Sequence, residues 1–129
     1  MYSHLSIGSN DLEKSKTFYD ALFAVLGGSP ATINPVTARM FYAHNGGLLM
    51  ICKPINGEAA SHANGGTIGF AMDSPEQVEA WHAAGIANGG TTCEDPPGVR
   101  ENPGMPKMHL AYLRDPDNNK LCALYRYPQ

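Results

Sequence analysis

The chain has 129 residues, of which 43% are hydrophobic and 16% are charged, and its formal net charge is −3. This length and composition predict one globular domain with its own core, and they exclude a disordered chain. The negative charge and the scattered basic residues argue against nucleic acid or an anionic membrane as the partner.

The chain also shows no signal for a membrane or for secretion. Its apolar runs, such as 48–52, are far too short to span a bilayer, and no charged segment followed by an apolar one opens the sequence. The three cysteines, Cys52, Cys93 and Cys122, form an odd and widely spaced set. We therefore expect free thiols in a cytoplasmic protein.

In chain order, a strand is expected over 2–9, where apolar and polar side chains alternate. A helix follows to about Leu26, with Asn10 as its N-cap and Glu13 completing a capping-box pattern. Residues 38–43 and 48–53 are the next predicted strands. The Asn-Gly pair between them is typical of a β-hairpin.

The second half begins after a polar, glycine-rich connection at 54–66. A strand is expected at 67–73, followed by a helix that Ser74 caps and that Gly89-Gly90 ends. Residues 95–107 contain four prolines and two glycines, which predicts a loop. The remaining strands are expected at 91–94, 108–114 and 120–126.

The two halves repeat one pattern, because the segment that begins at His4 and the segment that begins at Thr67 both read as a strand leading into a helix cap. Such a duplication predicts a β-α-β-β-β unit in each half, and the two units must bury their faces by packing. We expect an α+β fold in one domain, with a first module at about 1–54, a linker at 55–65 and a second module at 66–129.

Two motifs carry a family resemblance. The opening segment Ser-His-Leu-Ser-Ile-Gly-Ser-Asn-Asp-Leu-Glu-Lys-Ser-Lys-Thr-Phe-Tyr and the closing segment Leu-Arg-Asp-Pro-Asp-Asn-Asn-Lys-Leu-Cys-Ala-Leu resemble the vicinal oxygen chelate superfamily. That superfamily includes glyoxalase I, the bleomycin and fosfomycin resistance proteins and the extradiol dioxygenases. The resemblance implies two βαβββ modules forming a cup-shaped, mostly antiparallel sheet, the glyoxalase-like fold. It also implies a homodimer, and it leaves open whether the cup closes within one chain or across a swapped dimer.

The resemblance further implies a metal site with up to four protein ligands. His4 matches the histidine of the first strand. Met50 stands where glyoxalase I has a glutamate, Thr67 where a histidine is usual, and Cys122 where a glutamate follows the last turn. One of the four expected ligands is therefore kept.

This donor set is poorly suited to a divalent cation, which needs about three good protein ligands. The Met50 thioether and the Thr67 hydroxyl are neutral, and the Cys122 thiolate selects soft metals. We therefore expect no metal cofactor, with His4 and Cys122 as the remaining candidate ligands.

A ligand-binding cavity is expected instead, and its candidate lining residues are His4, Met50, Thr67, His109 and Cys122. Each has a structural alternative: His4 as a hydrogen-bonded strand residue, Cys122 as a small buried hydrophobe, and His109 as part of the core. A reactive Cys122 would need a nearby cation, which His4 could supply. Tyr42, Tyr112, Arg39 and Arg100 are further plausible substrate contacts, because arginine suits a carboxylate.

The loop at 95–107 has two interpretations. Its length and its position before two strands are typical of a lid or binding loop. It could equally be a proline-stiffened connection at a dimer contact.

Three functions follow as hypotheses. The first is a small-molecule-binding protein that lacks the metal, like resistance proteins that sequester a ligand, and its ligand would be apolar with one or two polar groups. The second is a metal-dependent lyase or dioxygenase-type enzyme with a non-standard metal set. The third is a structural or interaction dimer without a ligand. No residue is assigned a catalytic role.

Overall fold

The two halves of the chain build two separate sheets that share one layer of helices. The computed structural model describes all residues from 1 to 129. The first half contains β1 (Leu5–Gly8), α1 (Leu12–Val25), β2 (Arg39–His44) and β3 (Gly47–Cys52). The second half contains β4 (Ile68–Ala71), α2 (Pro75–Ala87), β5 (Thr91–Thr92), β6 (Gly98–Arg100), β7 (Met108–Arg114) and β8 (Lys120–Arg126).

The two sheets share the same arrangement of three strands. In the first sheet the strand order is β1-β3-β2, with β1 parallel to β3 and β2 antiparallel to it. In the second sheet the order is β4-β8-β7-β5, with β4 parallel to β8 and β7 antiparallel to it. The structure therefore confirms the α+β fold, and the shared strand order agrees with the repeat seen in the sequence.

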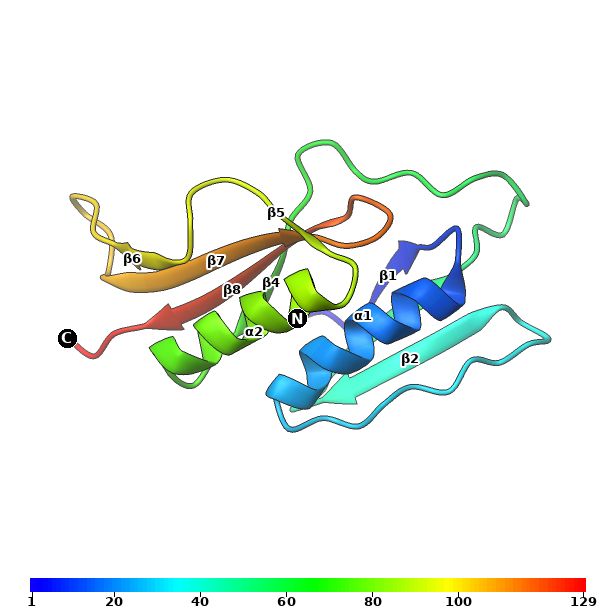
Figure 1. The fold of residues 1–129 in the computed structure, drawn as a ribbon, viewed down its shortest axis with the longest axis horizontal. Helices are drawn as coiled ribbons and strands as arrows, with labels where there is room; N and C mark the ends of the chain where they lie inside the picture. Colours follow the sequence, from blue (N-terminus) through cyan, green and yellow to red (C-terminus); the bar gives the residue numbers. More distant parts are fainter.

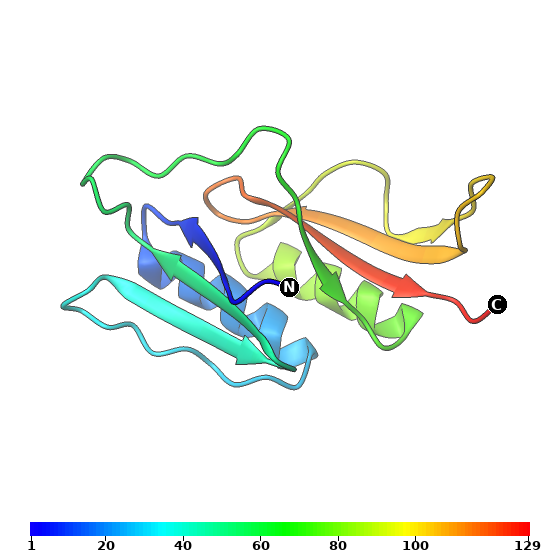
Figure 2. The ribbon, with the colours of Figure 1, turned by 180° about the vertical axis from the view of Figure 1, so that it is seen from behind.

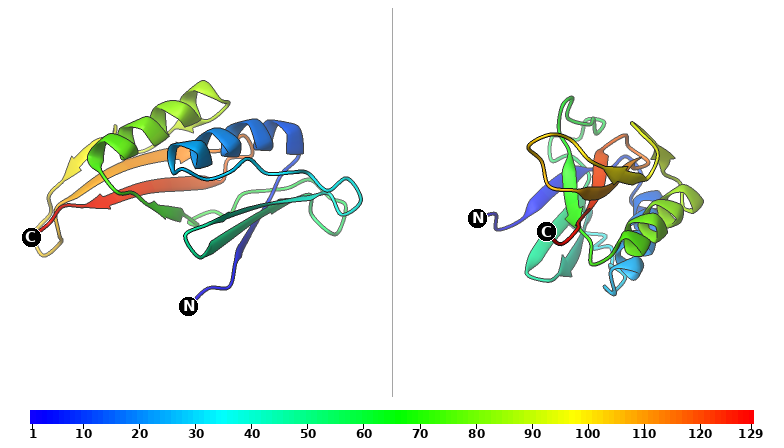
Figure 3. Two further views of the ribbon diagram at one scale, coloured as in Figure 1. Left: turned by 90° about the horizontal axis from the view of Figure 1, so that it is seen from below. Right: turned by 90° about the vertical axis from the view of Figure 1, so that its left-hand side faces the viewer.

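The helices α1 and α2 lie next to each other on one side of both sheets (Figures 1 and 3). Between the helices and the sheets lies a core that both halves supply, and Phe18, Trp81 and Leu113 are fully buried in it. The opposite side of each sheet is not covered by a helix (Figures 2 and 3). We call this side the open face.

The N-cap of α1 is Asp11, one residue later than predicted. The Asp11 side chain accepts a hydrogen bond from the backbone N–H of Lys14. The side chain of Asn10 instead bonds to Ala60, accepting from its backbone N–H at 2.7 Å and donating to its carbonyl at 3.2 Å. Asn10 thus fastens the connection between the two halves to the start of α1.

The hairpin between β2 and β3 forms as predicted. Asn45 and Gly46 have φ values of 47° and 80°, and positive φ at both central residues is the signature of a type I′ turn. The predicted capping of α2 is also confirmed, since Ser74 accepts from the N–H of Gln77 at 3.1 Å. The strands at 108–114 and 120–126 have the predicted bounds.

Two details differ from the prediction. The first half has three strands where a β-α-β-β-β unit predicts four, and beyond β2 only an isolated bridge joins Asn34 to Arg39. Pro35 and the turn that follows it interrupt pairing at this edge. In addition, residues 95–107 are not all loop. Residues 98–100, which contain no proline and include the β-branched Val99, form β6 and pair with β7.

Neither helix could cross a membrane. The helices α1 and α2 have 14 and 13 residues, and neither is long and apolar enough to span a bilayer.

Candidate functional site

The open face of the second sheet carries Cys122. Its neighbours across the strands are Tyr112 on β7 and Gly69 on β4. Residues adjacent to Cys122 along β8, Leu121 and Ala123, belong to the main core under the helices. Since side chains alternate between the two faces of a strand, Cys122 and Tyr112 point to the open side.

A small apolar cluster surrounds Cys122 on this face. Cys122, Met108 and Leu110 are buried and form a group separate from the main core. Tyr112 and Leu124 pack against the group as half-buried neighbours. The open face of the second sheet therefore carries a small apolar cluster of its own, which no helix covers.

The open face of the first sheet carries Met50. Met50 lies between Ser6 on β1 and Phe41 on β2, and Phe41 is 48% exposed. His4 precedes β1, is exposed, and its Nδ1 lies 2.8 Å from the hydroxyl of Ser3.

The four positions that the resemblance assigned to metal ligands thus form two equivalent pairs. Met50 is aligned with the residue two places after His4, and Cys122 is aligned with the residue two places after Thr67. The pairs lie on different sheets, and no strand of one sheet pairs with a strand of the other. Each half of the chain therefore carries one pair, and the two residues of each pair have the same offset between paired strands.

The chemistry of this donor set does not fit a hard divalent cation. His4 offers one good nitrogen donor, whereas Met50 and Thr67 offer neutral and weak ones. Burial raises the pKa of the Cys122 thiol, and hydrogen bonding with Tyr112 and the charges of Lys120 and Arg100 oppose that rise without reversing it. The thiol donates a hydrogen bond to the carbonyl of Ala123 at 3.6 Å. Nowhere in the chain do three His, Cys, Asp or Glu side chains gather as a metal site would require.

The raised pKa also bears on the reactivity of Cys122. A reactive thiolate needs a lowered pKa, and His4 is not among the groups that influence the thiol. The structure therefore favours Cys122 as a small buried hydrophobe over Cys122 as a nucleophile activated by His4.

His109 and Tyr42 lie on the side of the helices, not on the open faces. The Nε2 of His109 is 2.9 Å from a carboxylate oxygen of Glu79 on α2, and its Nδ1 is 3.1 Å from the hydroxyl of Tyr127. Tyr42 donates to Asp20 on α1 at 2.7 Å. His109 is therefore separated by the sheet from Cys122 and belongs with the helix contacts.

Polar residues surround the apolar cluster of the second sheet. Arg100 on β6 is aligned with Met108, and Lys120 pairs with Glu94 and lies 5.1 Å from the centre of the Tyr112 ring. A hollow of about 240 Å³ opens here, lined by Glu94, Asp95, Arg100, Asn102, Met108, Leu110 and Tyr112. Sequence reasoning did not find the pair of Lys120 with Glu94, although Lys120 could have been placed on this face from its alternation with Cys122.

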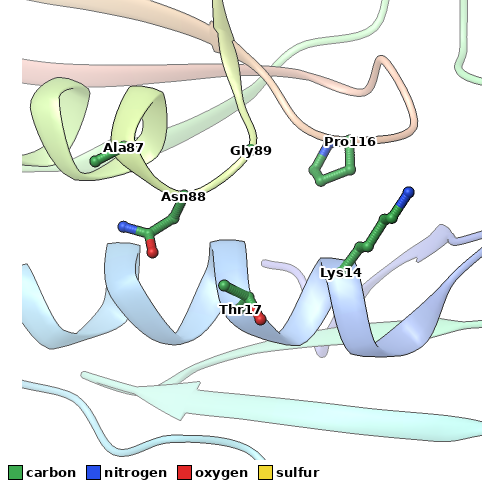
Figure 4. A pocket seen from close by; sticks show the side chains of 6 residues that line it. All are labelled: Lys14, Thr17, Ala87, Asn88, Gly89 and Pro116. Atoms are coloured by element: carbon green, nitrogen blue, oxygen red, sulfur yellow. The ribbon is translucent and has the colours of Figure 1, made fainter.

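Two other hollows lie elsewhere. A mostly apolar cleft of about 270 Å³ lies between the sheets, where β1 and β3 approach β4, and His44 is one of its few polar lining residues. A wider depression of about 530 Å³ lies on the side of the helices, between the first turns of α1, the end of α2 and the turn after β7 (Figure 4). Lys14 is its only charged residue, and none of the predicted site residues lines it.

Comparison with known proteins identifies the relatives of the chain. The family model of the Glyoxalase/Bleomycin resistance protein/Dioxygenase superfamily matches residues 2–123. A glyoxalase/bleomycin resistance protein from Albidiferax ferrireducens T118 is 57% identical, with a TM-score of 0.89 over 98% of this chain and 99% of that one. A comparison with curated protein sequences finds no match.

More distant solved structures share the fold alone. A variant of the fosfomycin resistance protein FosX from Listeria monocytogenes, in complex with Mn(II) and 1S,2S-dihydroxypropylphosphonic acid, is 18% identical, with a TM-score of 0.69 over 95% of this chain and 87% of that one. A lactoylglutathione lyase from Agrobacterium tumefaciens is 17% identical, with a TM-score of 0.66 over 97% and 92% of the two chains. The match over nearly the whole length, together with the repeated strand topology, shows that the chain belongs to the Glyoxalase/Bleomycin resistance protein/Dioxygenase superfamily.

Proposed function

We propose that this protein binds a small organic molecule on the open face of its second sheet and does so without a resident divalent cation. The observation that carries the proposal is the apolar cluster of Met108, Leu110 and Cys122, which lies on a face that no helix covers. Met108 and Leu110 of this cluster line the hollow of about 240 Å³, together with Arg100 and Tyr112. Small-molecule sites commonly combine a mostly apolar lining with a few polar groups that fix the orientation of the ligand.

The absence of a resident metal is proposed from the donor chemistry. Loss of several good ligands should abolish the binding of a hard cation, since the loss of even one residue that only hydrogen-bonds to a metal ligand lowers metal affinity by about 10–100-fold. Metal analysis of protein purified without chelator should therefore find far less than one metal ion per chain. Near-stoichiometric metal that disappears in a His4→Ala variant would contradict this part of the proposal.

Ligand binding itself is tested by a thermal-shift screen of small organic molecules. A ligand that binds only the folded state at 100 times its Kd adds about 2.7 kcal/mol of stability and raises the melting temperature. The shift should be lost in Tyr112→Ala and kept in Ile86→Ala, whose side chain is 44% exposed on the opposite side of the molecule. If no compound raises the melting temperature, the structural-dimer hypothesis is favoured instead.

We also propose that the protein is a homodimer. The open face of the first sheet exposes Phe41, together with the half-buried Leu48 and Met50, and covering such a surface is favourable by roughly 25 cal/mol per Å². Light scattering coupled to size-exclusion chromatography should give twice the mass of the chain. A Phe41→Asp variant should shift the protein toward the monomer, whereas Val36→Asp, exposed outside the sheets, should not.

A further inference from the structure

The hollow on the second sheet contains an arginine without an acidic partner. Arg100 makes no ion pair with a carboxylate, although Lys120 and Lys107, its neighbours on the same sheet and loop, each pair with a glutamate. The guanidinium is held instead by backbone carbonyls of the preceding loop. It donates to the carbonyl of Asp95 at 3.3 Å and to that of Pro96 at 2.8 Å.

These contacts fix the guanidinium while leaving part of it free. An arginine has five N–H donors, and the loop carbonyls, including a long contact of 3.4 Å to Val99, account for three of them. The fixed position matters because a guanidinium that is already ordered loses less conformational entropy when it binds a ligand.

The residue beside the guanidinium has no side chain. Gly98 is aligned with Leu110 on β7, and a Cβ added to Gly98 would lie 3.7 Å from an Nη atom of Arg100. A larger side chain at this position would cover the charged group, whereas glycine leaves it accessible from the hollow. The floor beside it is apolar, since Met108 and Leu110 line the same hollow.

We propose that Arg100 binds the carboxylate of a small aliphatic or aromatic carboxylic acid whose apolar body lies over Met108 and Leu110. This proposal rests on the proposed small-molecule function and specifies the class of ligand. The N–H groups of the guanidinium that the loop does not use can donate a charge-assisted hydrogen bond to a carboxylate oxygen. Tyr112 lines the same hollow, and its hydroxyl can donate a second hydrogen bond.

The surrounding charges favour a single negative charge over two. Glu94 and Asp95 also line the hollow, and only Glu94 has a cationic partner. A doubly charged phosphate would be repelled by these carboxylates more strongly than a carboxylate would. The hollow thus combines one free cation, acidic groups nearby and an apolar floor, which selects a monoanion with an apolar body.

The proposal is tested with two probes of the same shape and different charge, hexanoate and hexanamide, titrated against the full chain and followed by NMR or calorimetry. Hexanoate should bind at least ~10-fold more tightly than hexanamide, since a hydrogen bond to a charged group contributes about 1.5–3 kcal/mol. Arg100→Gln should remove this preference, and Arg100→Lys should weaken it because the lysine ammonium lacks the planar set of donors that the loop carbonyls hold in place. Gly98→Val should weaken hexanoate binding without changing the charge of the protein.

Arg126→Gln is the matched control, because Arg126 is an exposed arginine on the same sheet that does not line the hollow. This variant should keep the preference for hexanoate. Equal binding of the two probes, no binding of either, or an undiminished preference in Arg100→Gln would overturn the inference. The proposed small-molecule function would survive such a result if neutral compounds still gave thermal shifts that Tyr112→Ala removes.

Discussion

The hydroxyl of Tyr19 donates a hydrogen bond to a carboxylate oxygen of Asp115 at 2.5 Å, and both residues are buried. Tyr19 belongs to α1 in the first half, and Asp115 begins the turn between β7 and β8 in the second. Asn119 donates to the same carboxylate at 2.9 Å and to the carbonyl of Gly8 at 3.3 Å. The two halves are therefore joined by a polar contact as well as by the apolar core.

Replacing Tyr19 by phenylalanine should test this contact. The change removes one of the two donors to this carboxylate oxygen, to which Asn119 still donates, and the loss of a buried hydrogen bond to a carboxylate costs about 1–3 kcal/mol. Urea unfolding of Tyr19→Phe should show a loss of this size. Tyr2→Phe, in which the tyrosine is 77% exposed, should unfold like the native protein, and an equal stability of the two variants would refute the role of the contact.

The acid stability of the fold should depend on Asp20. Burial alone would raise the pKa of Asp20, but hydrogen bonds from Lys16, Tyr42 and the backbone of Ala31 outweigh burial and hold the pKa below its usual value. A carboxyl whose folded pKa is lowered contributes stability above its unfolded pKa of about 3.9, and this contribution is lost as the pH falls through the folded value.

Asp20→Asn should therefore remove part of the pH dependence. Between pH 6 and pH 2.5 the native protein should lose more free energy of unfolding than the variant does, because only the native protein has a carboxylate at position 20 to protonate. Asp73→Asn, at an exposed aspartate, serves as the control and should follow the native curve. Parallel curves for the native protein and Asp20→Asn would show that the prediction is wrong.

A close approach at Gly90 should make this position intolerant of any side chain. A Cβ there would lie 2.4 Å from the ring of Phe18, 2.9 Å from the carbonyl oxygen of Gly85 and 3.0 Å from that of Arg114. Backbone oxygens cannot move aside as a side chain can, so Gly90→Ala should destabilise the fold by about 1–3 kcal/mol. Gly69→Ala, where no atom lies within 4 Å of the added Cβ, should change stability far less in the same unfolding measurement.

The thiols should react in an order set by burial. Cys122 is buried and burial raises its pKa, whereas Cys52 and Cys93 are half-buried. Iodoacetamide labelling of the native protein near pH 7.5, followed by peptide mass spectrometry, should modify Cys93 and Cys52 well before Cys122, because the thiolate is the reactive form. Rapid labelling of Cys122 under these conditions would instead indicate an activated cysteine.

Much of this fold could be predicted because local signals agreed with the tertiary structure. The Asn45-Gly46 turn, the Ser74 cap and the alternation along β7 and β8 each have a local physical cause, and each appears as expected. The cap of α1 lies one residue later than the sequence predicts, because Asn10 and Asp11 are equally good caps in isolation. The contact of Asn10 with Ala60, which is distant in sequence, decides between them.

The candidate site was less predictable, because it depends on which face of a strand is turned to the helices. Alternation placed His109 on the same face as Ala111 and Leu113, but the sequence could not show that this face is the core. The contacts of His109 with Glu79 and Tyr127 decide it. The sequence identifies Arg100 only as one of several plausible substrate contacts, and its position in the hollow follows from the pairing of β6 with β7.

The bond between Asn10 and Ala60 limits how far the two halves can separate. A Cβ on Gly8 would approach the Cβ of Ala60 to 2.8 Å, so the connection is held against β1 as well as α1. Only residues 61–66 of the connection lie beyond this contact, and a segment of that length spans about 20 Å when it is fully extended. Any exchange of second halves between two copies must therefore take place between neighbours whose first halves are already closely apposed.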